Sequence, residues 1–292
     1  GKENTNIIVL DADLSKSTKT DTFKAVCPER FFNVGIAEQN LISVGAGLAA
    51  AGKIPFVSSF AMFATGRAFE QIRNAVCYPK LNVKVCATHA GITVGEDGAT
   101  HQSLEDISCM RTLPNMTVVV PADGIETEKV ILEAAKYNGP MYVRLGRSAV
   151  PTLFGEDYKF EIGKGTVLRD GNDATIIACG MMVNEAIIAH EELKAEGINV
   201  RVINMSTIKP IDRELIVKAA KETKAIVTAE EHSIIGGLGS AVSEVVSEEC
   251  PVIVKKVGVK DVFGESGTPA ELLEKYGLTA KHIAESVREA LK

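Results

Sequence analysis

The chain has 292 residues, of which 46% are hydrophobic and 24% charged, so it is long enough for two domains and has the composition of a folded globular protein. Its 38 acidic side chains outnumber the 32 basic ones and give a formal net charge of -6, which disfavours a nucleic-acid or anionic-membrane partner. The six cysteines are spread singly and no apolar run is long enough to cross a bilayer. These features predict reduced thiols, no zinc site, no membrane span and a cytoplasmic location.

Short β-branched segments alternate with longer helical patterns in the first half of the chain, which predicts βαβ units on a parallel sheet. The expected strands are Ile7–Leu10, Pro55–Ser58, Val83–Thr88, Thr117–Val120 and Met141–Arg144, and the expected helices are Ala37–Ala51, Ala64–Cys77 and Ile125–Tyr137.

Prolines and glycines interrupt the periodicity at Ser148–Gly165, and we place a boundary there, with domains expected at residues 1–155 and 156–292. The alternation then resumes, so the predicted fold is α/β with two domains, each a mainly parallel sheet flanked by helices, the second domain being smaller. The strands expected in the second half are Thr175–Cys179, Val200–Asn204, Ala225–Ala229 and Val252–Lys256, and the helices are Val183–Glu196, Arg213–Glu222, Leu238–Glu249 and Thr279–Leu291.

Two common phosphate-binding motifs are absent from the glycine-rich segments. The dinucleotide pattern G-x-G-x-x-G fails because Val242 stands where the third glycine is required, and a Walker A loop fails because Ile54 follows Gly52-Lys53. The run Gly236–Gly239 is therefore predicted to be a tight turn that opens a helix.

The first segment that indicates chemistry is Arg30–Leu41, RFFNVGIAEQNL, which leads into SVGAGLAAAG. Because nearly every residue after Asn40 is small or apolar, we expect the helix Ala37–Ala51 to be buried on most faces, with Glu38 near its start. A buried carboxylate is costly without a partner. Glu38 is then either a favourable charge at a helix N-terminus or a carboxyl group that shares a proton with a ligand nitrogen.

The second segment, Thr88–Asp106, places His89 at the end of a strand, with Asp97 and His101 in the glycine-rich loop that follows. Ligands bind beyond the carboxyl ends of strands in open α/β folds, and histidine serves as acid, base or hydrogen-bond donor near neutral pH. The alternatives are solvated loop histidines and a zinc site, and zinc is disfavoured because no third ligand has a usual spacing.

The third segment contains Phe60 and Phe63, which are three residues apart and share one face of a helix or turn. Core packing would account for this pair, and stacking against a flat cofactor ring is the alternative. His190, His232 and His282 lack convergent partners and are predicted to be structural or solvated.

Together these stretches resemble the C-terminal part of transketolase, in which a pyrimidine-binding domain is followed by the transketolase C-terminal domain. The resemblance covers essentially the whole chain and rests on GIAEQ and VGEDGATHQ, followed in the second half by GINVRVINMSTIKPID and TAEEHSIIGGLGSAV. Complete transketolases carry a further domain upstream that holds the diphosphate of thiamine diphosphate through Mg²⁺ or Ca²⁺. The resemblance therefore implies a split enzyme, in which a separate N-terminal subunit supplies the metal and diphosphate site; no metal ligand is assigned to this chain.

Position by position, the resemblance implies that Glu38 hydrogen-bonds the aminopyrimidine ring of the cofactor and is needed for its activation. It implies that Phe60 and Phe63 form the wall around this ring. Many members carry a further aromatic residue three positions on, where this chain has Gly66.

The resemblance also implies a set of substrate-binding residues. His89, Asp97 and His101 would hold the hydroxyl groups of the donor sugar, and the two histidines would assist proton movement. Ser17 and Arg147 would hold the substrate phosphate, a task that suits the bidentate guanidinium of arginine.

The implied activity is transfer of a two-carbon ketol unit between ketose and aldose phosphates, by a chain that is active only with its partner subunit and forms a hetero-oligomer containing paired copies. Three alternatives share these domains: an enzyme similar to 1-deoxyxylulose-5-phosphate synthase, a β-type subunit of a 2-oxoacid dehydrogenase, and a non-catalytic regulatory homologue. Glu96 before Asp97 in GEDGATHQ favours transketolase over the synthase.

Overall fold

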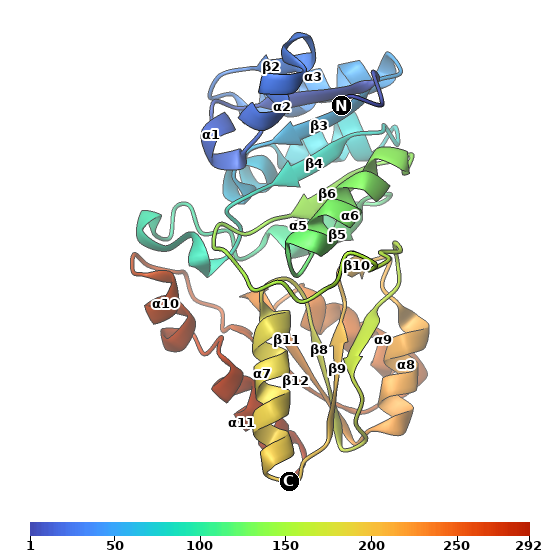
Figure 1. The fold of residues 1–292 in the computed structure, drawn as a ribbon, viewed down its shortest axis with the longest axis vertical. Coiled ribbons are helices and arrows are strands. Elements are labelled where there is room, and N and C mark those ends of the chain that lie inside the picture. Colours follow the sequence, from blue (N-terminus) through green and yellow to red (C-terminus); the bar gives the residue numbers. More distant parts are fainter.

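A computed structural model describes residues 1–292. The chain forms two twisted sheets, which follow one another along the long axis of the molecule (Figure 1). Each sheet has helices on both faces, which confirms the predicted α/β fold with two domains. The N-terminus lies in the first domain and the C-terminus at the far end of the second (Figure 1).

The first sheet has seven strands in the order β10-β5-β6-β4-β3-β1-β2. Strands β1 to β6 are mutually parallel, whereas β10 comes from the second half of the chain and pairs antiparallel with β5. The bounds are β1 Ile7–Asp11, β2 Phe31–Asn33, β3 Ile54–Ser58, β4 Lys84–Ala87, β5 Thr117–Val119, β6 Met141–Arg144 and β10 Thr207–Lys209.

Both faces of the first sheet are buried. Leu10 and Val57 belong to the largest apolar cluster, which α3 covers, whereas Val9 and Phe56 lie on the opposite face with α6. Neighbouring residues of one strand thus reach different apolar layers, which is why these strands are nearly continuous apolar runs. The helices here are α1 Ser15–Thr18, α2 Asp21–Val26, α3 Glu38–Ala50, α4 Phe69–Gln71, α5 Asp106–Thr112 and α6 Gly124–Lys136, with 3₁₀ segments at Pro28–Arg30 and Ile92–Asp97.

Two helical predictions for the first half were inaccurate. The expected regular helix Ala64–Cys77 is broken into π-helical segments at Met62–Arg67 and Ile72–Cys77 on either side of α4. Helix α3 is not buried on most faces, because Leu41 and Ile42 are buried while Val44 is 37% exposed. Small residues allow a helix to be buried on every side, but the chain alone covers only one side of α3.

The second sheet has five strands in the order β12-β11-β8-β9-β7, all parallel except β7. Helices α7 and α11 cover one face, α8 and α9 cover the other, and α10 lies beside the first domain (Figure 1). No helix of the protein is long and apolar enough to cross a membrane. The bounds are β7 Thr166–Arg169, β8 Ala174–Ala178, β9 Val200–Asn204, β11 Ala225–Ser233, β12 Ile253–Val259, α7 Met182–Ala195, α8 Arg213–Glu222, α9 Leu238–Glu249, α10 Pro269–Lys275 and α11 Ala280–Ala290.

The two domains share one apolar cluster and one strand. Ile177 and Ile203 of the second sheet belong to the same cluster as Leu10 of the first sheet. At the end of β10, the Lys209 ammonium donates to the carbonyl oxygens of Arg111 and Leu113 at 2.8 and 2.6 Å. The domains therefore cannot separate without breaking a sheet edge and opening a core.

A buried ion pair lies where the domains meet. Arg144, at the end of β6, donates from Nε to Asp106 Oδ2 at 2.7 Å, and the Tyr142 hydroxyl donates to the same oxygen at 2.6 Å. Burial alone would raise the pKa of Asp106, but the charge and hydrogen bonds of Arg144 hold it below its ordinary value. Arg144 also donates to the backbone carbonyl of Glu231 in the second domain at 2.9 Å.

We expect the Asp106→Ala variant to lose about 3–5 kcal/mol of unfolding free energy, because it leaves the buried Arg144 charge without a partner. Urea denaturation measures this loss. Glu244→Ala is the control, since Glu244 pairs with Arg111 at the same interface but its side chain is 61% exposed, and the expected loss is below about 1 kcal/mol. Equal losses in the two variants would contradict the role given to the buried pair.

Candidate functional site

The residues of the candidate site follow the carboxyl ends of parallel strands. Strands β1 to β4 and β6 run in the same direction, so the segments after them meet at one edge of the first sheet. In chain order these segments carry Ser17 after β1, Glu38 after β2, Phe60 and Phe63 after β3, His89, Asp97 and His101 after β4, and Arg147 after β6.

Glu38 is the first residue of α3 and is only 2% exposed. Its Oε2 accepts a hydrogen bond of 2.9 Å from Arg67 Nη1, and this guanidinium is 5.2 Å from the centre of the Phe63 ring. A negative charge at the start of a helix is favoured by the helix dipole. The helix start and the ion pair together account for the burial of this carboxylate, and Arg67, with 53% of its side chain exposed, forms one edge of the site.

Four rings form a continuous aromatic surface beside Glu38. Phe60 and Phe63 are 6.1 Å apart with nearly parallel planes, and Phe60 stacks on His89 at 3.9 Å. The His101 ring meets the edge of Phe63 at 5.2 Å. Phe60 is buried but lies outside the three large apolar clusters, and its ring packs instead against Phe63 and His89.

The loop after β4 changes direction at Gly91, Gly95 and Gly98, all of which have φ between +76° and +88°. Between the turns, the guanidinium of Arg147 donates to the Val94 carbonyl oxygen and contacts the Glu96 carboxylate at 3.3 Å. Arg147 thus connects the segment after β6 to the loop after β4.

An open pocket of ≈ 470 Å³ lies next to the aromatic surface. Ser17, His89 and Arg147 all line it, together with Lys19 and Thr88. Glu38, Asp97 and His101 do not line this pocket. All predicted site residues except Asp97 therefore form two neighbouring groups, and His89 belongs to both, whereas Asp97 is exposed on the loop after β4.

His89 is neutral in this environment. Burial, reinforced by the positive charge of Arg147 and partly offset by Asp97, lowers its pKa to about 4. Its Nδ1 lies 3.0 Å from the Thr88 hydroxyl oxygen. At neutral pH the ring therefore offers one donor and one acceptor, and the positive charge of this pocket comes from arginine and lysine side chains such as Arg147 and Lys19.

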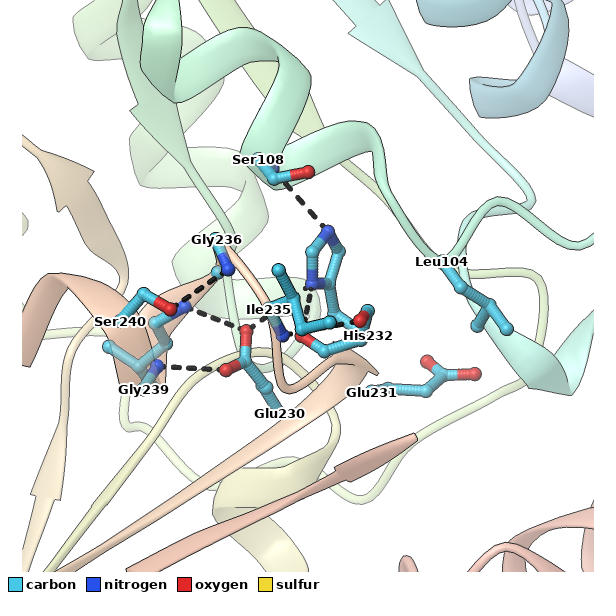
Figure 2. Close-up of polar contacts among 12 residues, drawn as sticks. Leu104, Ser108, Glu230, Glu231, His232, Ile235, Gly236, Gly239 and Ser240 are labelled. Atoms are coloured by element: carbon cyan, nitrogen blue, oxygen red, sulfur yellow. Dashed lines mark hydrogen bonds and ion pairs between the residues drawn. The ribbon is translucent and has the colours of Figure 1, made fainter. Parts of the chain in front are cut away.

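Of the three other histidines, His190 and His232 are buried, and His282 is half-buried. His190 on α7 contacts the Val200 carbonyl oxygen at 2.9 Å, and His282 contacts the Thr279 hydroxyl at 2.8 Å. His232, for which convergent partners were not expected, is fully buried at the domain junction, where its Nε2 lies 3.4 Å from the backbone nitrogen of Ser108 (Figure 2). Its burial agrees with the structural role predicted for it, but the contact with Ser108 was not expected, because α5 and β11 lie far apart in the sequence.

Sequence reasoning also missed Arg67, which pairs with Glu38, and Lys19 and Glu231, which line the open pocket. Arg67 lies four residues after Phe63, a spacing that could have placed both side chains on one helical face. Lys19 has a positive φ of 64° and ends α1, so its presence in the pocket depends on a backbone conformation that the sequence does not indicate.

Comparison with known proteins gives a consistent family assignment. Residues 1–152 match the pyrimidine-binding domain of transketolase, and residues 163–283 match the transketolase C-terminal domain. The chain is 55% identical to a putative transketolase C-terminal section of Methanocaldococcus jannaschii, over 100% of its own length and 92% of that protein. It is 46% identical to a 6-deoxy-6-sulfo-D-fructose transketolase subunit of Clostridium sp., over 97% of this chain and 88% of that subunit.

Among solved structures, a split-gene transketolase described as an inactive β4 tetramer is similar in fold and sequence. The TM-score is 0.94 at 61% identity, and the match covers 100% of this chain and 94% of the other. These three matching chains are therefore of nearly this length, whereas this chain covers only 46% of the transketolase of Homo sapiens, to which it is 40% identical.

The His89 environment predicts a pH-dependent stability. The unfolded chain takes up a proton near the ordinary pKa of 6.5, whereas the native state does so only near 4, so the unfolding free energy should fall as the pH is lowered through this window. Urea denaturation at about pH 7 and about pH 5 measures the fall. His89→Asn should show a smaller fall than the wild type, and identical falls would refute the neutral-histidine assignment.

Proposed function

Because the chain belongs to the transketolase family, we propose that it is the C-terminal subunit of a split transketolase. In this proposal it transfers a two-carbon ketol unit between ketose and aldose phosphates, with thiamine diphosphate as cofactor. A separate N-terminal subunit completes the site and holds the diphosphate with Mg²⁺ or Ca²⁺, and paired copies of both chains form the active oligomer.

The observation that carries the proposal is the buried Glu38 carboxylate beside the aromatic surface. Glu38 has one hydrogen-bond partner, Arg67, although a carboxylate has room for several donors. A flat ring with a protonated nitrogen matches this set, because Glu38 can accept from the nitrogen while Phe60 and Phe63 contact the ring. The residues present therefore fit the aminopyrimidine part of thiamine diphosphate.

The bound cofactor would supply the carbanion chemistry needed to attack a ketose carbonyl. This chain would contribute Glu38, which holds a proton at the ring nitrogen, and the aromatic wall, which fixes the ring plane and excludes water.

The pocket beside the aromatic surface supports a phosphorylated substrate. Arg147 and Lys19 supply positive charge, and Ser17 and the neutral His89 supply hydrogen-bonding groups. We assign the phosphate to this pocket. The donor hydroxyl groups are assigned to His89, His101 and Asp97, with the two histidines assisting proton movement when the carbon–carbon bond breaks.

An interface beside the site supports the need for a partner. Ile36, two residues before Glu38, is 79% exposed, Phe32 is 45% exposed, and Val44 lies on the uncovered side of α3. Exposed apolar side chains grouped next to a binding site are typical of a surface that another subunit covers. The description of the similar split-gene structure as inactive agrees with a chain that requires a partner.

The direct test is to assay the chain alone, the N-terminal subunit from the same genome alone, and the mixed pair. With xylulose 5-phosphate as donor and ribose 5-phosphate as acceptor, we expect turnover only in the mixture. Parallel reactions use 6-deoxy-6-sulfofructose as donor, or pyruvate. Turnover of pyruvate without ketol transfer would replace this proposal with a synthase or dehydrogenase activity, and no turnover of any substrate would favour a regulatory homologue.

The role of Glu38 is tested by Glu38→Gln in the mixed pair. The amide keeps the shape of the side chain but cannot share a proton with the ring, so kcat should fall by about 100-fold or more. Glu70→Gln, an exposed change in α4, serves as the control and should retain wild-type turnover. Size-exclusion chromatography checks that both variants assemble; near-normal turnover of Glu38→Gln would remove Glu38 from cofactor activation.

A further inference from the structure

The loop Gly91–Gln102 carries Asp97 and His101 but contains no strand or α-helix, only a short 3₁₀ segment. Within the first domain, its support includes the Gly91 N–H donating to the Ser103 carbonyl at 2.9 Å and the Gln102 amide donating to the carbonyls of Ile92 and Gly95. A glycine-rich loop of this kind has a high conformational entropy when it is free. Its conformation must therefore be fixed by further contacts.

The strand β11 supplies such a contact from the second domain. Glu230 and Glu231 are consecutive residues at its end, so their side chains point to opposite sides (Figure 2). Glu230 accepts from the backbone N–H groups of Leu238 and Gly239 at 2.7 and 2.8 Å and so caps α9 within its own domain. Glu231 instead crosses to the first domain, where its Oε1 accepts from the Thr93 N–H at 2.7 Å.

The contact between Glu231 and the loop leaves no room for a side chain at position 91. A Cβ atom on Gly91 would lie 2.3 to 2.6 Å from the three carboxyl atoms of Glu231, and Gly91 has a φ of +88°. Glu231 is 4% exposed and Thr93 is 1% exposed, so this hydrogen bond is largely shielded from solvent. The backbone of the loop is thus packed directly on a carboxylate of the other domain.

The backbone of Glu231 is itself fixed, because its carbonyl oxygen accepts from Arg144 at 2.9 Å. The second domain also holds the far end of the loop. Gln102 donates to the Glu265 carbonyl at 2.9 Å, and a Cβ on Gly98 would lie 2.6 Å from the Ser266 hydroxyl. These residues precede α10, which lies beside the loop (Figure 1).

We propose that Glu231 is a positioning residue that holds the loop Gly91–Gln102 in the conformation that presents Asp97 and His101 to the substrate. The second domain would then contribute to substrate binding through the loop, in addition to lining the open pocket with Glu231. The part of this inference that concerns substrate rests on the proposed function; the part that concerns the order of the loop does not.

Hydrogen–deuterium exchange on the full chain, read by mass spectrometry, tests the order of the loop without any assay of activity. Glu231→Ala removes a charge-assisted hydrogen bond and should speed exchange in peptides from Gly91–Gln102 by about 10- to 100-fold. Glu230→Ala is a matched control from the same strand end, and it should speed exchange in Leu238–Glu249 while leaving the loop unchanged. Glu231→Gln, which keeps an acceptor oxygen for Thr93, should restore most of the protection.

A double-mutant cycle separates direct contact from general destabilisation. Gly91→Ala places a methyl group against the Glu231 carboxylate and should loosen the loop by itself. In the Glu231→Ala background that clash is absent, so the two changes together should accelerate exchange less than the product of the separate effects. Independent effects, or equal loop exchange in Glu231→Ala and Glu230→Ala, would overturn the proposal.

In the mixed pair of subunits, Glu231→Ala should raise the KM for the ketose phosphate donor by about tenfold and lower kcat, with the KM for thiamine diphosphate changed less than about twofold. Glu231→Gln should recover most of this loss. A variant with a loosened loop but wild-type donor kinetics would refute the link to substrate. If the wild-type pair shows no ketol transfer, the proposed function fails, and the exchange experiments still decide whether Glu231 orders the loop.

Discussion

The arrangement of the site depends on the buried guanidinium of Arg144. Its side chain is 6% exposed, and it donates to the Asp106 carboxylate at the start of α5 and to the Glu231 carbonyl at the end of β11. A guanidinium presents its donors in a fixed plane, so it sets the relative positions of the groups it joins. Because it lies at the end of β6, three residues before Arg147, the same side chain also fixes where the pocket-lining segment leaves the sheet.

The positions of Arg144 and Arg147 determine the charge states of the buried groups around them. The burial of Asp106 is tolerated because Arg144 compensates it, whereas burial raises the pKa of Glu231 and Arg144 only partly offsets this effect. Arg147, on the open side, is 41% exposed and reinforces the effect of burial, which keeps His89 neutral. Arg144 thus joins the two domains, whereas Arg147 lies in the open pocket, where an anionic ligand can reach it.

Much of the fold follows from local pattern. The β-branched runs predicted β1, β3 and β6 closely, and Glu38 could be identified because it is the one carboxylate that begins a helix of small and apolar residues. The three-residue strand β10 could not be predicted, since it forms only against β5 of the other domain. The exposed face of α3 differs from expectation for a related reason: small residues permit burial, but only a neighbouring surface produces it.

The roles of residues that act through tertiary contacts were harder to predict from the sequence. The sequence contains Glu230, Glu231 and His232 as neighbours, yet each contacts a different element: α9, the loop after β4 and the start of α5. Alternation along β11 explains why adjacent side chains diverge, but which of them reaches the other domain depends on how the sheets are stacked. The glycines of the loop define its conformation only together with the packing of the second domain. Gly91, for example, provides the space that the Glu231 carboxylate fills. A residue of the second domain can therefore determine the conformation of a loop in the first, although nothing in the spacing of either segment relates one to the other.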